Sequence, residues 1–181
     1  MTDERKQQLY QNYQSVTARI EAARRRRYAK TGVDTPVTLL GASKTMEAED
    51  IAYLMTDCGL RVAGENRAQE FAAKYDAVHA AGGAYDFIGH LQTNKVKYLI
   101  GKTYLIHSLD RTELADELQK RAEKADWTAD CLIEVNIGCE LSKSGFAPEN
   151  AENAYEKLRA YPNLRIRGVM AMLPLSDDTM L

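Results

Sequence analysis

Polar side chains follow several short apolar segments of this 181-residue chain. They occur at Ser43-Lys44-Thr45, Gly64-Glu65-Asn66-Arg67, Gly89-His90-Leu91-Gln92, His107-Ser108 and Asn136, and Met170 closes the last segment. If the apolar segments are strands of a parallel sheet, these side chains gather at its carboxyl edge, where α/β proteins bind ligands. The sequence therefore predicts a ligand-binding site at that edge, lined by these side chains.

Lys44 offers the most specific chemistry of this set. It comes directly after the apolar segment Val37–Ala42, so we expect its side chain to project over the carboxyl edge of the sheet. Desolvation there disfavours the ammonium form and leaves a nucleophilic amine that can form a Schiff base with a carbonyl compound. On the residue alone, a lysine that simply extends from the strand end into solvent is the favoured interpretation.

Other motifs are weak or missing. The sequence holds no glycine-rich phosphate loop of the GxGxxG or GxxxxGK[ST] type, which argues against dinucleotide and NTPase functions. Ser142-Lys143-Ser144-Gly145 could hold an anion, although such a segment is more often only a loop. We expect no Ser-His-Asp or Cys-His catalytic arrangement, and His107 could equally be a hydrogen-bonded core histidine. Three scattered cysteines lack metal-ligand spacing, so we expect no metal site and a reducing, cytoplasmic location.

The elements that position these residues are predicted as one long helix followed by alternating strands and helices. The helix spans Asp3 to Lys30, ends at Thr31-Gly32, and carries an apolar stripe at three- and four-residue spacing, formed by Leu9, Tyr13, Val16, Ile20 and Ala23. The expected strands, mostly buried on both faces, are Val37–Ala42, Leu60–Ala63, Tyr85–Ile88, Tyr104–Ile106, Cys131–Val135 and Ile166–Met170. The expected helices are Ala48–Cys58, Ala68–His79, Thr93–Ile100, Thr112–Ala125 and Glu149–Ala160.

This alternation predicts an α/β fold with parallel strands. A doubly wound open sheet fits the chain length, whereas a (β/α)8 barrel typically needs about 250 residues. The pattern alone does not separate the two. The net charge of −2 gives no electrostatic reason to expect a nucleic-acid or membrane partner. The chain begins with charged residues, so we expect no signal peptide, and no apolar run approaches the length of about 20 residues that spans a membrane.

Several blocks together resemble one known family. They are Gly41-Ala42-Ser43-Lys44-Thr45, Gly64 to Glu70, Phe87 to Lys95, Ile106 to Asp110, Val135-Asn136-Ile137, Lys143-Ser144-Gly145 and Arg167-Gly168-Val169-Met170. In their order and spacing they resemble the pyridoxal phosphate homeostasis proteins, the YggS/PROSC group. The resemblance implies a TIM (β/α)8 barrel of the alanine-racemase N-terminal type. It also implies that residues 1–181 form one pyridoxal-phosphate-binding domain, here lacking the last two βα units.

The same resemblance implies the site. Pyridoxal 5′-phosphate would be the cofactor, held as a Schiff base on Lys44, with Asn66, His90 and Met170 placed around it. Family members continue through two further βα units that hold the cofactor phosphate. We therefore expect these 181 residues alone to bind the cofactor weakly or not at all, and we expect the open sheet edges to favour pairing with another chain.

The function that the resemblance implies is intracellular vitamin B6 homeostasis rather than catalysis. We expect a cofactor carrier, with no residue in a catalytic role, pyridoxal-phosphate-dependent apoenzymes as candidate recipients, and a monomer as in the family unless the open edges produce an oligomer. The alternatives are a Schiff-base lyase that uses Lys44 without cofactor, a pyridoxal-phosphate racemase, and an interaction domain whose first helix packs on a partner.

Overall fold

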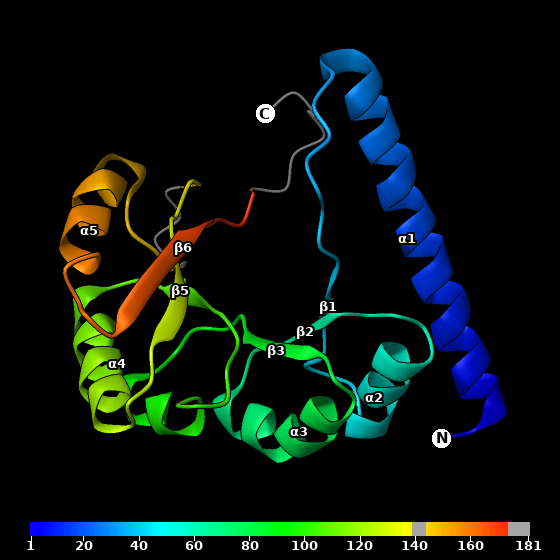
Figure 1. Cartoon of the computed structure of the whole chain (residues 1–181), viewed down its shortest axis with the longest axis horizontal. Helices are drawn as coiled ribbons and strands as arrows, with labels where there is room; N and C mark the ends of the chain where they lie inside the picture. The colour runs from blue at the N-terminus through cyan, green and yellow to red at the C-terminus, as the bar shows by residue number, and fades with distance from the viewer. Residues whose placement is uncertain (139–143, 174–181) are drawn as a thin grey trace. The chain divides into compact units, whose positions relative to one another are not determined.

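A computed structural model describes residues 1–138 and 144–173 (Figure 1). Its strands are β1 (Leu40–Ala42), β2 (Val62–Glu65), β3 (Ala84–Phe87), β4 (Ile106–Leu109), β5 (Ala129–Glu134) and β6 (Leu164–Met170). Its helices are α1 (Asp3–Thr31), α2 (Ala48–Thr56), α3 (Ala68–Ala80), α4 (Thr112–Lys124) and α5 (Ala151–Leu158), with the short 3-10 helices η1 (Thr93–Tyr98) and η2 (Pro148–Asn150). The predicted alternation of strands and helices is confirmed.

The strands form one six-stranded sheet in the order β1-β2-β3-β4-β5-β6. The strand pairs are parallel, with Leu40 beside Val62 in the β1–β2 pair and Glu134 beside Met170 in the β5–β6 pair. Strands that follow one another in the chain are therefore neighbours in the sheet. The strands of a barrel follow this order, whereas in a doubly wound sheet the strand order reverses at a switch point. The strand order thus favours the barrel over the open sheet.

The chain divides into two compact units. The first comprises Met1–Gly64 and Ala73–Tyr85, and the second comprises Glu65–Ala72 and the described part of Asp86–Leu181. The assignment of residues 1–181 to a single domain stays a prediction.

Helix α1 of the first unit begins and ends close to where the sequence predicts. Thr2 caps the start, because its hydroxyl accepts a hydrogen bond from the backbone N–H of Arg5 at 3.2 Å. Gly32 caps the end in the left-handed region, with φ at 70°, and its N–H donates to the Tyr28 carbonyl. The apolar stripe is less buried than expected, since Leu9 is buried but Val16 and Ala23 are exposed.

The second unit is built around α4 and the longest strands. Helix α4 packs against η1, β5 and β6. Four of its apolar residues are fully buried, namely Leu114, Ala115, Leu118 and Ala122. Spacing of three and four residues places them on one face of the helix, as the predicted amphipathic pattern requires.

Every predicted strand overlaps an observed one, but the bounds differ by up to three residues, and β6 also differs in burial. β1 begins at Leu40 rather than Val37, which is half exposed and lies before the strand. β4 begins at Ile106, two residues later than predicted, because Ile106 is the first of its residues that pairs with Phe87 of β3 and Cys131 of β5. β6 is largely exposed instead of buried on both faces, because among the described residues it pairs only with β5.

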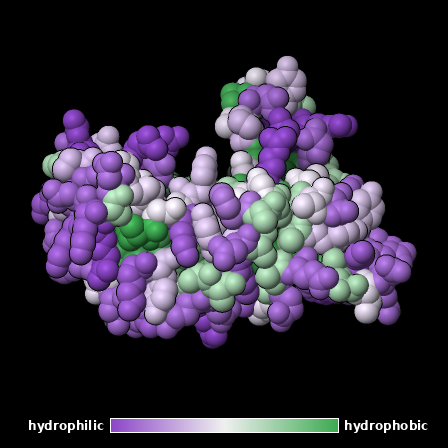
Figure 2. Space-filling model, turned by 60° about the horizontal axis from the view of Figure 1, so that its bottom comes forward, coloured by the Kyte–Doolittle hydropathy of each residue, from purple (hydrophilic) through white to green (hydrophobic). Residues whose placement is uncertain are grey.

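Hydrophilic residues dominate the face of the molecule drawn in Figure 2, with smaller apolar areas between them. Within the described residues, no helix is both long enough and apolar enough to cross a membrane.

Candidate functional site

The turn that carries Lys44 is fixed by the residue before it. Ser43 is buried, and both its backbone N–H and its hydroxyl donate to the carbonyl of Gly64, at 2.8 and 2.9 Å. The Ser43 hydroxyl also lies 3.3 Å from the Tyr85 hydroxyl. The backbone carbonyl of Ser43 accepts a hydrogen bond from Lys74 Nζ at 3.0 Å. These contacts anchor Lys44 directly beyond the carboxyl end of β1, where the sequence predicts it.

The Lys44 side chain itself is exposed. This corrects the expectation of a desolvated amine, because β1 ends at Ala42 and the buried position after the strand is taken by Ser43. The amine is therefore open to a carbonyl compound arriving from solvent. The assignment of Lys44 as a Schiff-base residue stays a prediction.

The loop after β2 holds Asn66 in the second unit. The buried carboxylate of Glu65 accepts hydrogen bonds from the backbone N–H groups of Asn66 and Arg67, at 2.7 and 3.3 Å. The loop after β3 approaches so closely that a Cβ on Gly89 would lie 2.2 Å from the Asn66 carbonyl oxygen. The side-chain oxygen of Asn66 is buried and has no hydrogen-bond partner among the described residues. It can therefore accept a hydrogen bond from a bound molecule.

His90 lies beside Asn66. Both residues line a cavity of about 200 Å³, together with Arg67, Gln69, Gln92 and Lys95. The loops after β2 and β3 thus bring together two of the four predicted cofactor residues. Lys44 belongs to the first unit, and Met170 does not line this cavity.

Two residues that the sequence analysis did not assign to the site hold His90. Its Nδ1 lies 3.0 Å from Asp110 Oδ2 and 3.0 Å from the Ser144 hydroxyl. The side chain of Asp110 is only 4% exposed, and its other oxygen accepts a hydrogen bond from Arg111. Arg111 in turn donates to the Leu91 carbonyl at 2.8 Å, which ties the end of β4 to the loop after β3.

This cluster is not a Ser-His-Asp catalytic triad. In such a triad the serine and the aspartate contact different ring nitrogens, whereas Ser144 and Asp110 share Nδ1 of His90. The sequence pattern does not select Asp110, because it predicts that the fourth strand ends at Ile106 and that His107-Ser108 follows it. With β4 ending at Leu109, the same rule about strand ends selects Asp110.

The carboxyl ends of β5 and β6 carry two further residues of interest in the second unit, Glu134 and Met170. Met170 is partly buried, and its carbonyl accepts a hydrogen bond from the Val135 N–H at 2.8 Å. Glu134 pairs in register with Met170. Burial raises the pKa of the Glu134 carboxyl, the negative Asp110 raises it further, and His90 lowers it. Ser142 and Lys143 lie outside the described residues.

His107 forms part of the core, as one of the two interpretations from the sequence stated. Its Nε2 lies 2.9 Å from Asp86 Oδ2, and its side chain is 17% exposed. The second oxygen of Asp86 is buried without a partner among the described residues. The described residues contain no group of His, Cys, Asp and Glu side chains that could hold a metal ion.

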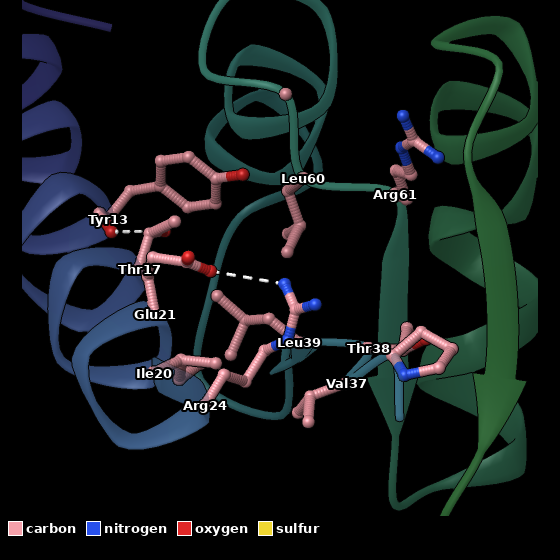
Figure 3. A pocket seen from close by; sticks show the side chains of 12 residues that line it. Tyr13, Thr17, Ile20, Glu21, Arg24, Val37, Thr38, Leu39, Leu60 and Arg61 are labelled. Atoms are coloured by element: carbon pink, nitrogen blue, oxygen red, sulfur yellow. Dashed lines mark hydrogen bonds and ion pairs between the residues drawn. The ribbon is translucent and has the colours of Figure 1, made fainter. Parts of the chain in front are cut away.

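The first unit contains a cavity of about 340 Å³ (Figure 3). It is lined by side chains of α1, by Pro36–Leu39 just before β1, and by Gly59–Arg61. Lys44 lies beyond the opposite end of β1 and is not part of the lining. This cavity is therefore not the predicted cofactor site.

Comparisons with known proteins agree with the fold. A family model described as "Alanine racemase, N-terminal domain" matches residues 7–180. A structure of an unknown protein from Bifidobacterium adolescentis is 29% identical, with a TM-score of 0.89 over 98% of this chain and 74% of that one. The strand order and these matches define an α/β barrel of the alanine-racemase N-terminal type.

Curated relatives identify the group within that class. The pyridoxal phosphate homeostasis protein of Aquifex aeolicus is 53% identical over 77% of this chain and 61% of its own length. That of Pasteurella multocida is 33% identical over 95% of this chain and 71% of its own length. The chain belongs to the pyridoxal phosphate homeostasis protein family. It spans about 61% of the length of the Aquifex aeolicus relative.

A structure of PipY from Synechococcus elongatus, described as having PLP bound, is 26% identical to this chain. Its TM-score is 0.67, over 83% of this chain and 71% of the PipY chain. The present residues offer groups that suit such a molecule. Lys44 supplies an accessible primary amine, and Asn66 supplies a buried carbonyl oxygen that has no partner within residues 1–138 and 144–173.

Proposed function

We propose that this chain binds pyridoxal 5′-phosphate at Lys44 and serves as a carrier that buffers this cofactor in the cell. The observation that carries the proposal is the position of Lys44, which the buried Ser43 anchors just beyond β1 in a chain of this family. The relatives' name and the PLP-bound PipY structure support it.

The bound cofactor would supply an aldehyde that reacts reversibly with a lysine amine. The residues around it would provide non-covalent contacts. Asn66 would accept a hydrogen bond through its unpartnered side-chain oxygen, His90 would contribute a ring nitrogen, and Met170 a polarizable apolar surface. These assignments follow from the family motifs and from the placement of the residues at strand ends.

We propose a non-catalytic function, because the relatives are named for homeostasis of the cofactor rather than for a reaction. Candidate partners are apoenzymes that receive the cofactor by release from Lys44. The free thiols of Cys58 and Cys131 support the expectation of a reducing, cytoplasmic location.

The test is an absorbance titration of the protein with pyridoxal phosphate. Because the expected binding is weak, the titration is carried to high cofactor concentration. There we expect a visible absorbance band that Lys44→Ala abolishes and that Lys120→Ala, a change of an exposed lysine on α4, leaves in place. Borohydride reduction followed by peptide mass spectrometry should place the cofactor on Lys44. An identical band in Lys44→Ala, or attachment at another lysine, would contradict the proposal.

One further measurement tests another part of the proposal. Incubation with L- and D-amino acids in deuterated water tests the carrier function. Exchange of the Cα proton at enzyme-like rates would show catalysis instead.

A further inference from the structure

The buried carboxylate of Asp110 binds a different cationic or donor side chain with each of its oxygens. Oδ1 accepts a hydrogen bond from Arg111 Nη1, and Oδ2 lies 3.0 Å from His90 Nδ1. Arg111 is itself held by the Leu91 carbonyl. The carboxylate is therefore fixed in orientation, with one oxygen committed to each neighbour.

This arrangement determines which nitrogen of His90 carries the proton. An ionised carboxylate only accepts hydrogen bonds, so His90 Nδ1 must be the N–H that donates to Asp110. The Ser144 hydroxyl, 3.0 Å from the same nitrogen, can adapt because a hydroxyl both donates and accepts. In the neutral ring, Nε2 is then left with a lone pair. Nε2 is also the one polar ring atom that His90 can still offer to the cavity it lines with Asn66.

We propose that Asp110 is the positioning residue that fixes His90 in its Nδ1–H form, so that Nε2 accepts a hydrogen bond from a donor group of bound pyridoxal phosphate. This inference rests on the proposed function for its ligand. The part that concerns the tautomer rests only on the contacts among Asp110, Arg111 and His90.

The substitution Asp110→Asn separates this positioning from mere packing. Asparagine has the shape of aspartate, but one oxygen becomes an NH₂ donor. Arg111 can only donate, so the remaining oxygen of Asn must face Arg111 and the NH₂ group must face His90. Nδ1 of His90 then has to accept, and the proton moves to Nε2. The cluster keeps its shape while the exposed nitrogen changes from acceptor to donor.

Nitrogen-15 NMR of the imidazole rings, recorded without cofactor, reads the tautomer directly. The chain has three histidines, so the His90 signals can be assigned with a single His90→Gln variant. We expect Nδ1–H in the wild type and Nε2–H in Asp110→Asn. Ser144→Ala is the matched control, because it removes the other contact of Nδ1 and should leave the tautomer unchanged. A wild-type Nε2–H form, or no change in Asp110→Asn, would overturn the assignment.

The ligand part is tested by pyridoxal phosphate affinity in a double-mutant cycle. Asp110→Asn should weaken binding about two- to tenfold, the range for loss of one hydrogen bond. In a His90→Ala background the same change should have no further effect, whereas a structural loss would persist there. Unchanged affinity in Asp110→Asn overturns this part. Absence of binding by the wild type refutes the proposed function, while the NMR result still decides the position of the proton.

Discussion

At the scale of single residues, acidic side chains gather at strand ends of the second unit. Glu134 at the end of β5 is half-buried, and Asp110 after β4 is almost inaccessible. Arg111 and His90 compensate Asp110, but Glu134 has its pKa raised by burial first and by the negative Asp110 second. The charged form of Glu134 is therefore disfavoured in the folded protein, which has a consequence for stability.

Glu134→Gln should stabilise the protein at neutral pH. Because the folded pKa is above the unfolded one, the unfolded chain releases this proton more readily, and stability falls as pH rises through that interval. Urea unfolding at pH 7 should give a higher midpoint for Glu134→Gln. The difference should vanish near pH 3, below the ordinary glutamate pKa of about 4.3, where the Glu134 carboxyl is neutral in both the folded and the unfolded chain. Glu152→Gln on the exposed face of α5 is the control, and an equal gain there would contradict this account.

Cys131 should be inert in the native protein. It is fully buried in β5, and burial, with a further contribution from Asp130, raises its pKa to about 12. The thiolate that reacts with alkylating agents is therefore almost absent at pH 8. Iodoacetamide should label Cys131 only after denaturation, as measured by peptide mass spectrometry. Rapid labelling under native conditions would show that β5 opens easily.

At the scale of elements, the sequence predicted helices better than strands. Helix ends depend on local residues, and the glycines that close α1 and follow α2, Gly32 and Gly59, are visible in the sequence. Strand ends depend on distant partners, so β4 was placed two residues early. Because the predicted end of β4 lies before the observed one, the sequence does not identify Asp110 as the residue that follows this strand. The sequence does identify Lys44, because β1 ends where predicted. The remaining contacts of His90 come from residues 20 and 54 positions away, which no local pattern reveals.

The attachment of α1 to α2 depends on Arg5 and Asp50. Both Nε and Nη2 of Arg5 donate to Asp50 Oδ2, at 3.0 and 2.7 Å, and Asp50 is buried. Asp50→Ala should lower the free energy of unfolding by about 1–3 kcal/mol, because charge-assisted hydrogen bonds are lost. Arg25→Ala removes only an exposed pair with Glu21 and should change it by less than about 0.5 kcal/mol. Equal effects in chemical denaturation would refute the distinction.

The close approach of the loops after β2 and β3 predicts a strict requirement for glycine at position 89. A Cβ there would lie 2.2 Å from the backbone oxygen of Asn66, which cannot move without displacing its loop. Gly89→Ala should therefore destabilise the protein by about 1–3 kcal/mol. Gly83→Ala is the matched control, since its new Cβ would meet the flexible end of Met55. A smaller loss in Gly89→Ala than in Gly83→Ala would contradict the argument.

At the scale of the whole molecule, the strand order decided what the sequence pattern left open. Alternating strands and helices suit both an open sheet and a barrel, because each unit looks alike in either fold. Consecutive pairing from β1 to β6, together with the family match over residues 7–180, identifies the barrel type. The same order leaves β6 with a partner on one side only among the described residues.

The unpaired side of β6 predicts concentration-dependent self-association. Val169 is 67% exposed on this strand, and an exposed apolar edge offers free N–H and carbonyl groups to another chain. Sedimentation velocity should show association of the wild type as concentration rises. Val169→Lys should shift the chain toward monomer, because a charge on the edge opposes pairing. Asn153→Lys adds the same charge on exposed α5 without touching the edge, and it should leave association in place. A wild type that stays monomeric throughout, or equal effects of the two lysines, would show that β6 is not the pairing surface.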